Sequence, residues 1–148
     1  MKYMITMLVA LGLIAGCSTN QSLSYQERDE AYGEYIESQE LLSQDKIRTF
    51  KFNGWQSLSN NYLIISTSPN KKYLIEVSGF CSNLYHAQTI AVNQGMSSSL
   101  VTRFDSISVP DSPGNKCFIK SIYKVTRAQV KEISALGKVD KEQAEQYL

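Results

Sequence analysis

The sequence feature that most restricts the fold of this chain is a pair of apolar runs, rich in β-branched residues, that are joined by a short turn. Residues 62–67 and 73–78 each have the length and composition of a β-strand. Between them, residues 68–71 read Ser-Pro-Asn-Lys, a composition typical of a tight turn. Because so short a turn joins strands in antiparallel order, the sequence predicts a hairpin within an antiparallel sheet.

Further short strands are expected on both sides of this hairpin. Residues 48–52 alternate with period two, which places Phe50 and Phe52 on one face of a strand. Asn53-Gly54 then gives a strong hairpin-turn signal. Later runs with strand character are residues 89–92, 104–109 and 117–125.

A helix is expected before the strands. Ser24 and Glu27 have the spacing of a capping box, which pairs two amides at a helix start. Tyr and Ile side chains then recur near helical spacing, and Leu42 widens the stripe. The pattern predicts an acidic amphipathic helix over residues 25–43, with Gly33 as a weak point.

A second capping box, Thr126 with Gln129, predicts a helix after the last strand, and Gly137 fits its stop position. Asp140 can cap a last short helix. The chain is therefore expected to be α+β. It combines an N-terminal helix, a mainly antiparallel β-meander or small barrel over residues 46–125, and one or two C-terminal helices over 126–148.

The N-terminus has the features of an export signal. Lys2 precedes residues 4–15, a run of twelve uncharged and mostly apolar residues that is shorter than the roughly 20 needed to span a membrane. The run ends in Ile14-Ala15-Gly16-Cys17, which resembles the lipobox of bacterial lipoproteins. In that family the cysteine thiol is diacylated and the chain is cut just before it.

The lipobox resemblance implies a location and a division of the chain. It predicts a lipoprotein signal peptide over residues 1–16, a lipidated tether over 17–24 and a single periplasmic domain over 25–148. Ser18, rather than Asp, follows Cys17, which by analogy with the enterobacterial sorting rule favours the outer membrane. We therefore expect a protein of the cell envelope that is lipid-anchored in the outer membrane and faces the periplasm.

Export would also explain the other two cysteines. The periplasm is oxidising, so Cys81 and Cys117 are free to form a disulfide, with two separate buried thiols as the alternative. Such a bridge closes a loop of about 37 residues, for which the chain-entropy model gives roughly 4 kcal/mol of stabilisation.

A series of short motifs covering roughly residues 30–135 resembles a family of uncharacterised proteobacterial envelope proteins, known only as a domain of unknown function. The motifs are Trp55-x-x-Leu58, Tyr73-Leu74-Ile75-Glu76, Cys81-x-x-Leu84-x-x-Ala87-x-x-Ile90, Phe104-Asp105-Ser106-Ile107 and Cys117-x-Ile119-x-x-Ile122. The resemblance implies a small secreted β-rich domain with its two cysteines paired. It brings no activity or substrate with it.

The formal net charge of +1 hides two opposed segments and argues against a nucleic-acid partner. Residues 17–45 carry a net charge of −6 and residues 46–124 a net charge of +6. Within the basic segment, Lys116, Lys120 and Lys124 are spaced four residues apart, on one face of a strand. This row could attract lipid headgroups, an acidic envelope polymer or an acidic envelope protein. The alternatives are a solvated face and a face covered by the acidic helix.

The aromatic side chains allow two interpretations. Trp55, together with three phenylalanines, is expected to fill the core, and the phenylalanines are Phe50, Phe104 and Phe118. The alternative is that some aromatic side chains form an exposed binding patch. Trp55 and the lysine row are the residues of a possible interaction face.

The residues offer little support for catalysis. His86 is the only histidine, and it lacks clear co-ligands for a metal, so neither a metal site nor a cofactor is expected. A Ser-His-Asp set could draw on His86 and Asp105, but no serine lies in a nucleophile elbow. Glu76, Asp105 and Asp111 could act as paired carboxylates, but nothing in the sequence brings them together.

We therefore expect no catalytic residues and a non-enzymatic binding or interaction module. The second hypothesis is a periplasmic inhibitor of an envelope hydrolase, because lysozyme inhibitors share the format of a small, β-rich, disulfide-bearing lipoprotein. The third is a cell-envelope hydrolase.

The lipid anchor leads to a first prediction. Metabolic labelling with a palmitate analogue is expected to mark the wild-type protein and to miss Cys17→Ser, because the thiol of Cys17 is the attachment point for the lipid. Label retained by Cys17→Ser would contradict the lipobox interpretation.

Overall fold

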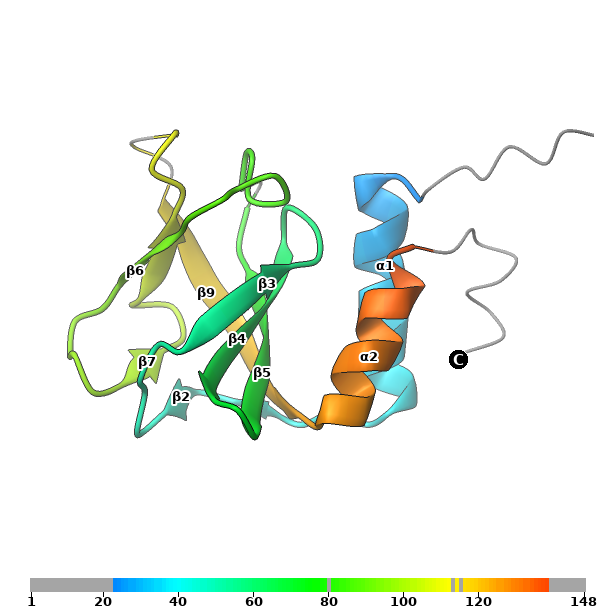
Figure 1. Cartoon of the computed structure of the whole chain (residues 1–148), viewed down its shortest axis with the longest axis horizontal. Coiled ribbons are helices and arrows are strands. Elements are labelled where there is room, and N and C mark those ends of the chain that lie inside the picture. Colours follow the sequence, from blue (N-terminus) through cyan, green and yellow to red (C-terminus); the bar gives the residue numbers. More distant parts are fainter. Residues whose placement is uncertain (1–22, 80, 113, 115, 139–148) are drawn as a thin grey trace, which may run out of the picture.

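The computed structural model describes residues 23–79, 81–112, 114 and 116–138 (Figure 1). Helix α1 (Tyr25–Ser38) begins this part of the chain and helix α2 (Arg127–Leu136) ends it. The strands between them are β1 (Ser43–Gln44), β2 (Lys46–Ile47), β3 (Gly54–Ser57), β4 (Tyr62–Ser68), β5 (Lys71–Val77), β6 (Ala91–Asn93), β7 (Leu100–Val101), β8 (Ser106–Ser108) and β9 (Lys116–Val125). Neither helix within these residues is long and apolar enough to cross a membrane.

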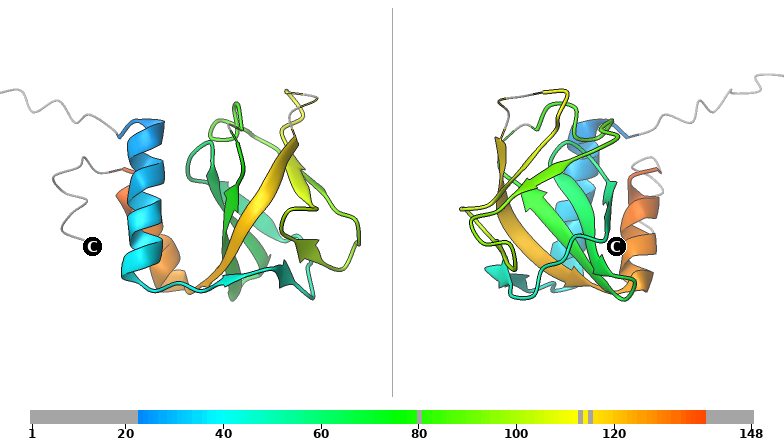
Figure 2. Two further views of the ribbon diagram at one scale, coloured as in Figure 1. Left: turned by 180° about the vertical axis from the view of Figure 1, so that it is seen from behind. Right: turned by 60° about the vertical axis from the view of Figure 1, so that its left-hand side comes forward.

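The strands form one antiparallel sheet that curls into a half-barrel, with both helices packed on one side of it (Figures 1 and 2). The strand order is β3-β4-β5-β9-β8-β6, and β1 pairs with the end of β9. A separate two-stranded ladder joins β2 to β7. The expected α+β class, with a mainly antiparallel sheet and a helix at each end, is confirmed.

Strands β4 and β5 form the expected hairpin and are buried on both faces. Residues 62–67 are all buried. Leu63 and Ile65 point into the half-barrel, whereas Tyr62 and Ile64 point toward the helices. This double burial explains why the run is apolar throughout rather than alternating, because each face of the hairpin has to exclude water.

Two hydrophobic clusters result. The barrel core lies inside the half-barrel and is built from Ile47, Phe50, Leu63, Ile65, Tyr73, Ile75, Val77, Cys81, Leu84, Ile90, Leu100, Ile107, Val109, Cys117, Ile119 and Ile122. The helix-side core lies between the sheet and the helices and is built from Tyr32, Tyr35, Leu58, Tyr62, Ile64, Leu74, Val125, Ile133 and Leu136. The sheet separates the two cores.

A register shift changes the faces of β9. Glu76 lies opposite Ser121, but Val77 lies opposite Ile119, so β9 carries one extra residue at this point. An extra residue in a ladder is a β-bulge, and it reverses the alternation of side chains beyond it. As a result, Ile119 and Ile122 both face the barrel core. They are three residues apart, a spacing that would place them on opposite faces of a regular strand.

Helix α1 begins as expected and ends earlier than expected. The capping box of Ser24 and Glu27 is present. The prediction of a helix to residue 43 is wrong, because α1 ends at Ser38 and the backbone at Glu40 turns into the left-handed region with a φ of 49°. Leu42 therefore does not extend the apolar stripe, and its side chain is 87% exposed.

Hydrogen bonds tie α1 to the loop between β3 and β4. The side chains of Ser59 and Asn61 donate to the carboxylate of Asp29, with an Asn61 Nδ2 to Oδ2 distance of 2.7 Å. Burial raises the pKa of Asp29, and the two hydrogen bonds oppose this shift because they favour the charged form. The acidic helix therefore contacts the strand region here through neutral polar groups.

The segment before β3 differs from its prediction. Residues 48–53 form no strand, and Asn53-Gly54 is not a hairpin turn, because Gly54 begins β3 and the Asn53 amide donates to the Ser66 carbonyl at 2.9 Å. The hairpin from β3 to β4 instead turns at residues 58–61. A strand partner, rather than the dipeptide alone, decides the conformation at this point.

Helix α2 confirms the second capping box and its end at Gly137. The backbone at Gly137 is right-handed and would accept any residue, but a Cβ atom there would collide with the Tyr32 hydroxyl. Tyr32 is fully buried and donates a hydrogen bond to the Leu58 carbonyl, so its ring has little freedom to move aside. The short helix expected after Asp140 lies outside the described residues.

A disulfide joins Cys81 to Cys117, as expected from an oxidising compartment, with a Cα–Cα distance of 5.8 Å. It ties the series of turns over residues 81–87 to the first residues of β9. Both half-cystines belong to the barrel core. The bridge therefore holds a segment without regular structure against the sheet.

Removing this bridge gives the second prediction. The double variant Cys81→Ala/Cys117→Ala should lose roughly 4 kcal/mol of unfolding free energy, because its unfolded chain is no longer closed into a loop. Urea unfolding measures the loss, and wild type treated with a reductant is the matched control. Unchanged unfolding midpoints in both samples would contradict a stabilising role.

The contact of Gly137 with Tyr32 gives the third prediction. Gly137→Ala should destabilise the protein by about 1–3 kcal/mol, because the added methyl group overpacks a buried site. Gly33→Ala is the matched control. Nothing lies within 4 Å of a Cβ atom at this helical position, so alanine should stabilise by up to about 1 kcal/mol there. Thermal unfolding compares the two, and equal shifts would contradict the close contact.

Candidate functional site

The outer face of the first half of β9 is exposed. Lys116, Phe118 and Lys120 point outward, while Cys117 and Ile119 between them are buried in the barrel core. The helices cover the outer face of the sheet at β4 and β5 and leave this region, together with β8 and β6, uncovered (Figures 1 and 2). Phe118, an apolar side chain, is 45% exposed here.

Two residues of the preceding loop extend this surface. The Arg103 amide donates to the Ile119 carbonyl at 2.7 Å, and the Ile119 amide donates to the Asp105 carbonyl at 3.0 Å. These two bonds hold Phe104 beside the backbone of β9 at Ile119, two residues before Ser106, which lies opposite Phe118, and Phe104 is 81% exposed. We call the surface made by Arg103, Phe104, Lys116, Phe118 and Lys120 the β8–β9 face.

The β8–β9 face combines apolar and positively charged groups. Lys120 Nζ lies 2.6 Å from a carboxylate oxygen of Glu76, and this ion pair raises the pKa of Lys120. Arg103 and Lys116 are exposed, and neither forms an ion pair with another described residue. The face therefore presents two cations that are available to a ligand beside two phenylalanine rings.

The structure divides the lysine row expected from the sequence. Lys124 comes after the β-bulge and lies opposite Tyr73, on the barrel-core face of β9. Lys116 lies before the bulge and Lys120 is its extra residue, and both point outward. The prediction of one face for all three lysines is therefore wrong, because the extra residue reverses the alternation. Trp55 is also not part of this face, since it lies in β3 and packs against the barrel core.

The aromatic prediction is partly wrong as well. Phe50 and Trp55 do contribute to the barrel core, as expected. Phe104 and Phe118 were expected there too, but both are exposed. The exposure of Phe118 could have been predicted from the sequence. Cys117 and Ile119, the residues on either side of it, are apolar and buried, and successive side chains of a strand point to opposite faces.

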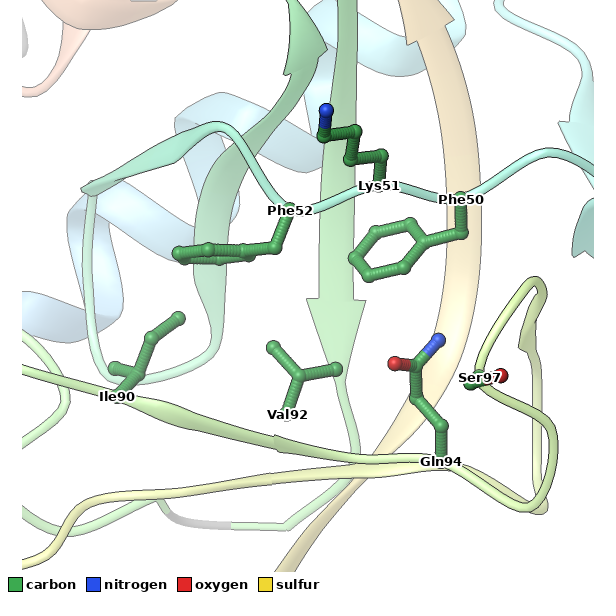
Figure 3. Close-up of a pocket in the computed structure, with 7 residues that line it drawn as sticks. All are labelled: Phe50, Lys51, Phe52, Ile90, Val92, Gln94 and Ser97. Carbon is green, nitrogen blue, oxygen red and sulfur yellow. The ribbon is translucent and has the colours of Figure 1, made fainter.

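A groove at the open side of the half-barrel is a second candidate site (Figure 3). Phe50, Lys51 and Phe52 form its roof, and Ile90, Val92 and Gln94 form its floor, with Ser97 at one end. Its volume is about 400 Å³, within the range of small-molecule sites. Phe50 and Phe52 share this groove, so the expectation that they lie on one side holds even though the segment is not a strand. We call this site the Phe52 groove.

His86 belongs to an aromatic cluster rather than to a catalytic set. Its Nε2 lies 2.7 Å from the Tyr25 hydroxyl, and its ring packs edge-on against Tyr85. Arg28 is only 8% exposed and places its guanidinium 4.6 Å from the centre of the Tyr85 ring, a cation–π contact. The cluster joins the start of α1 to the turns after Cys81, which is a structural role.

Two of the three carboxylates considered for catalysis have structural partners, and the third, Asp111, is exposed in a loop. Asp105 is buried and accepts hydrogen bonds from the amides of Gly95, at 2.9 Å, and Val101, at 2.6 Å, so it closes the loop between β6 and β8. Glu76 pairs with Lys120. Within the described residues, no three His, Cys, Asp or Glu side chains are grouped so that they could hold a metal ion.

The comparison with protein families identifies one match. A model described as a family of unknown function, DUF6491, matches residues 1–147. The chain belongs to this family. No curated protein and no solved structure matches it. Membership of DUF6491 agrees with the resemblance to an uncharacterised family seen in the sequence, and it transfers no activity to the β8–β9 face or to the Phe52 groove.

Proposed function

We propose that this protein is a non-enzymatic binding module, lipid-anchored at Cys17 in the outer membrane, that contacts an acidic partner protein in the periplasm through its β8–β9 face. The observation that carries the proposal is the exposure of Phe104 and Phe118 beside Arg103 and Lys116. Large apolar side chains in water are costly unless a partner covers them.

The composition of the face indicates the chemistry of the partner. Aromatic and arginine side chains are enriched at the centres of protein interfaces. Residues 46–124 carry a net charge of +6, which would attract an acidic surface over long range and at low salt. An acidic polymer would use the charges alone, whereas a protein would also cover the two phenylalanine rings. The rings therefore favour a protein partner.

The fourth prediction tests the face in cells. A photo-crosslinking amino acid at position 118 should capture a discrete partner, and the same group at position 42 should not, because Leu42 is exposed but lies outside the face. With the purified partner, Phe118→Ser should weaken binding about tenfold through loss of an apolar anchor. Lys116→Glu should also weaken binding, and its effect should be larger at low salt than at high salt, because salt screens exposed charges.

Two outcomes would overturn the proposal. Equal capture from positions 118 and 42 would show that the face is not selective. Binding that depends on Lys116 but not on Phe118 would indicate an acidic polymer rather than a protein. If the captured partner is an envelope hydrolase and its activity falls on binding, the binding module is an inhibitor of that hydrolase.

A further inference from the structure

The Phe52 groove is lined by side chains that face each other across a gap. Figure 3 shows the rings of Phe50 and Phe52 directed toward Val92 and Ile90 on the opposite wall. The alternate residues 90, 92 and 94 line the floor because successive side chains of a strand point to opposite faces. A ligand in this groove would therefore meet side chains rather than the edge of a strand.

This geometry favours an alkyl chain over a peptide. A peptide strand needs backbone partners for its amide and carbonyl groups, which a strand edge supplies and two facing rows of side chains do not. An alkyl chain has no such groups and gains free energy from each methylene that leaves water. Phe52 is 42% exposed at the roof, so the groove is open to a ligand from solvent.

The two ends of the groove differ in polarity. Ile90 and Phe52 lie toward one end, whereas Gln94 and Ser97 lie toward the other, near Phe50 (Figure 3). A ligand that matches this arrangement is amphiphilic, with an apolar chain along the phenylalanine rings and a polar head at the Gln94 end.

The charge of the roof segment indicates the sign of that head. Lys46, Arg48 and Lys51 are exposed in this segment, and the sequence contains no Asp or Glu from position 46 to position 75. Lys51 itself borders the groove, with its ammonium group directed away from it (Figure 3). These cations contribute a positive field on the roof side of the groove, which complements an anionic head.

We propose that the Phe52 groove binds the single alkyl chain of a fatty-acid-like anionic amphiphile. The chain lies between the rings of Phe50 and Phe52 and the side chains of Ile90 and Val92. The anionic head lies at the Gln94 end, in the field of the basic roof segment. This site is separate from the β8–β9 face, and it does not rest on the function proposed for that face.

Trp55 provides a direct readout for this site. It is the only tryptophan in the chain and packs against the barrel core, which includes Phe50 and Ile90 and which Val92 also contacts. A bromine atom on a bound alkyl chain quenches the fluorescence of a nearby indole. We would titrate the full-length protein in phosphatidylcholine vesicles with 12-bromododecanoate and follow Trp55 emission.

The expected result is saturable quenching that unbrominated dodecanoate reverses by competition. Phe52→Gln should bind about fivefold more weakly or worse, because it removes apolar contact from an exposed roof position without disturbing the core. Leu42→Gln, an equally polar change at an exposed site outside the groove, should bind as the wild type does. The same chain with a trimethylammonium head should bind about fivefold more weakly as well.

Several results would overturn the proposal. Quenching that does not saturate, or that Phe52→Gln leaves unchanged, would show partition into the vesicle rather than binding in the groove. Equal binding of the cationic amphiphile would contradict the assigned head. Displacement of the bromododecanoate by an apolar peptide but not by dodecanoate would assign the groove to a peptide instead.

Discussion

The backbone pairing of β9 is the interaction on which the rest of the structure depends. This one strand is hydrogen-bonded to β5 along much of its length, to β8 at its start and to β1 near its end. It also carries Cys117 of the disulfide and leads directly into α2. The bulge opposite Glu76 lets β9 contribute to the barrel core at Ile119 and Ile122 and to the helix-side core at Val125. Without this change of face, Ile122 would point away from the barrel core and Val125 would point toward it.

Local patterns predicted the elements whose conformation is decided locally. Both capping boxes, the β4–β5 hairpin and the end of α2 at Gly137 follow from nearest neighbours in sequence. The conformation of Asn53-Gly54 and the bulge in β9 are decided by partners far along the chain, such as the Ser66 carbonyl. The exit from α1 is made by local hydrogen bonds, such as that from the Leu41 amide to the Ile36 carbonyl, which the apolar stripe does not indicate. The prediction for the lysine row was wrong because the spacing of residues along β9 does not reveal the β-bulge, which appears only in the pairing of β9 with β5.

The two candidate surfaces differ in how much of them the sequence could reveal. The exposed Phe118 between two lysines fits a simple alternation with the buried Cys117 and Ile119. The Phe52 groove joins residues about 40 positions apart, and it exists because the sheet stops at a half-barrel and leaves the segment before β3 facing β6. Its two walls belong to no common motif, so only their arrangement in space brings them together.

Helices α1 and α2 run antiparallel on the sheet, so the chain enters α1 and leaves α2 at the same end of the domain (Figure 1). The turn between β4 and β5 lies at the opposite end. A circular permutation that joins the two helix ends and opens this turn would keep every strand pairing. If the chain is anchored at Cys17 as proposed, the permutation would move the point of attachment to the far end of the domain, and the protein would present its other end outward with its core unchanged.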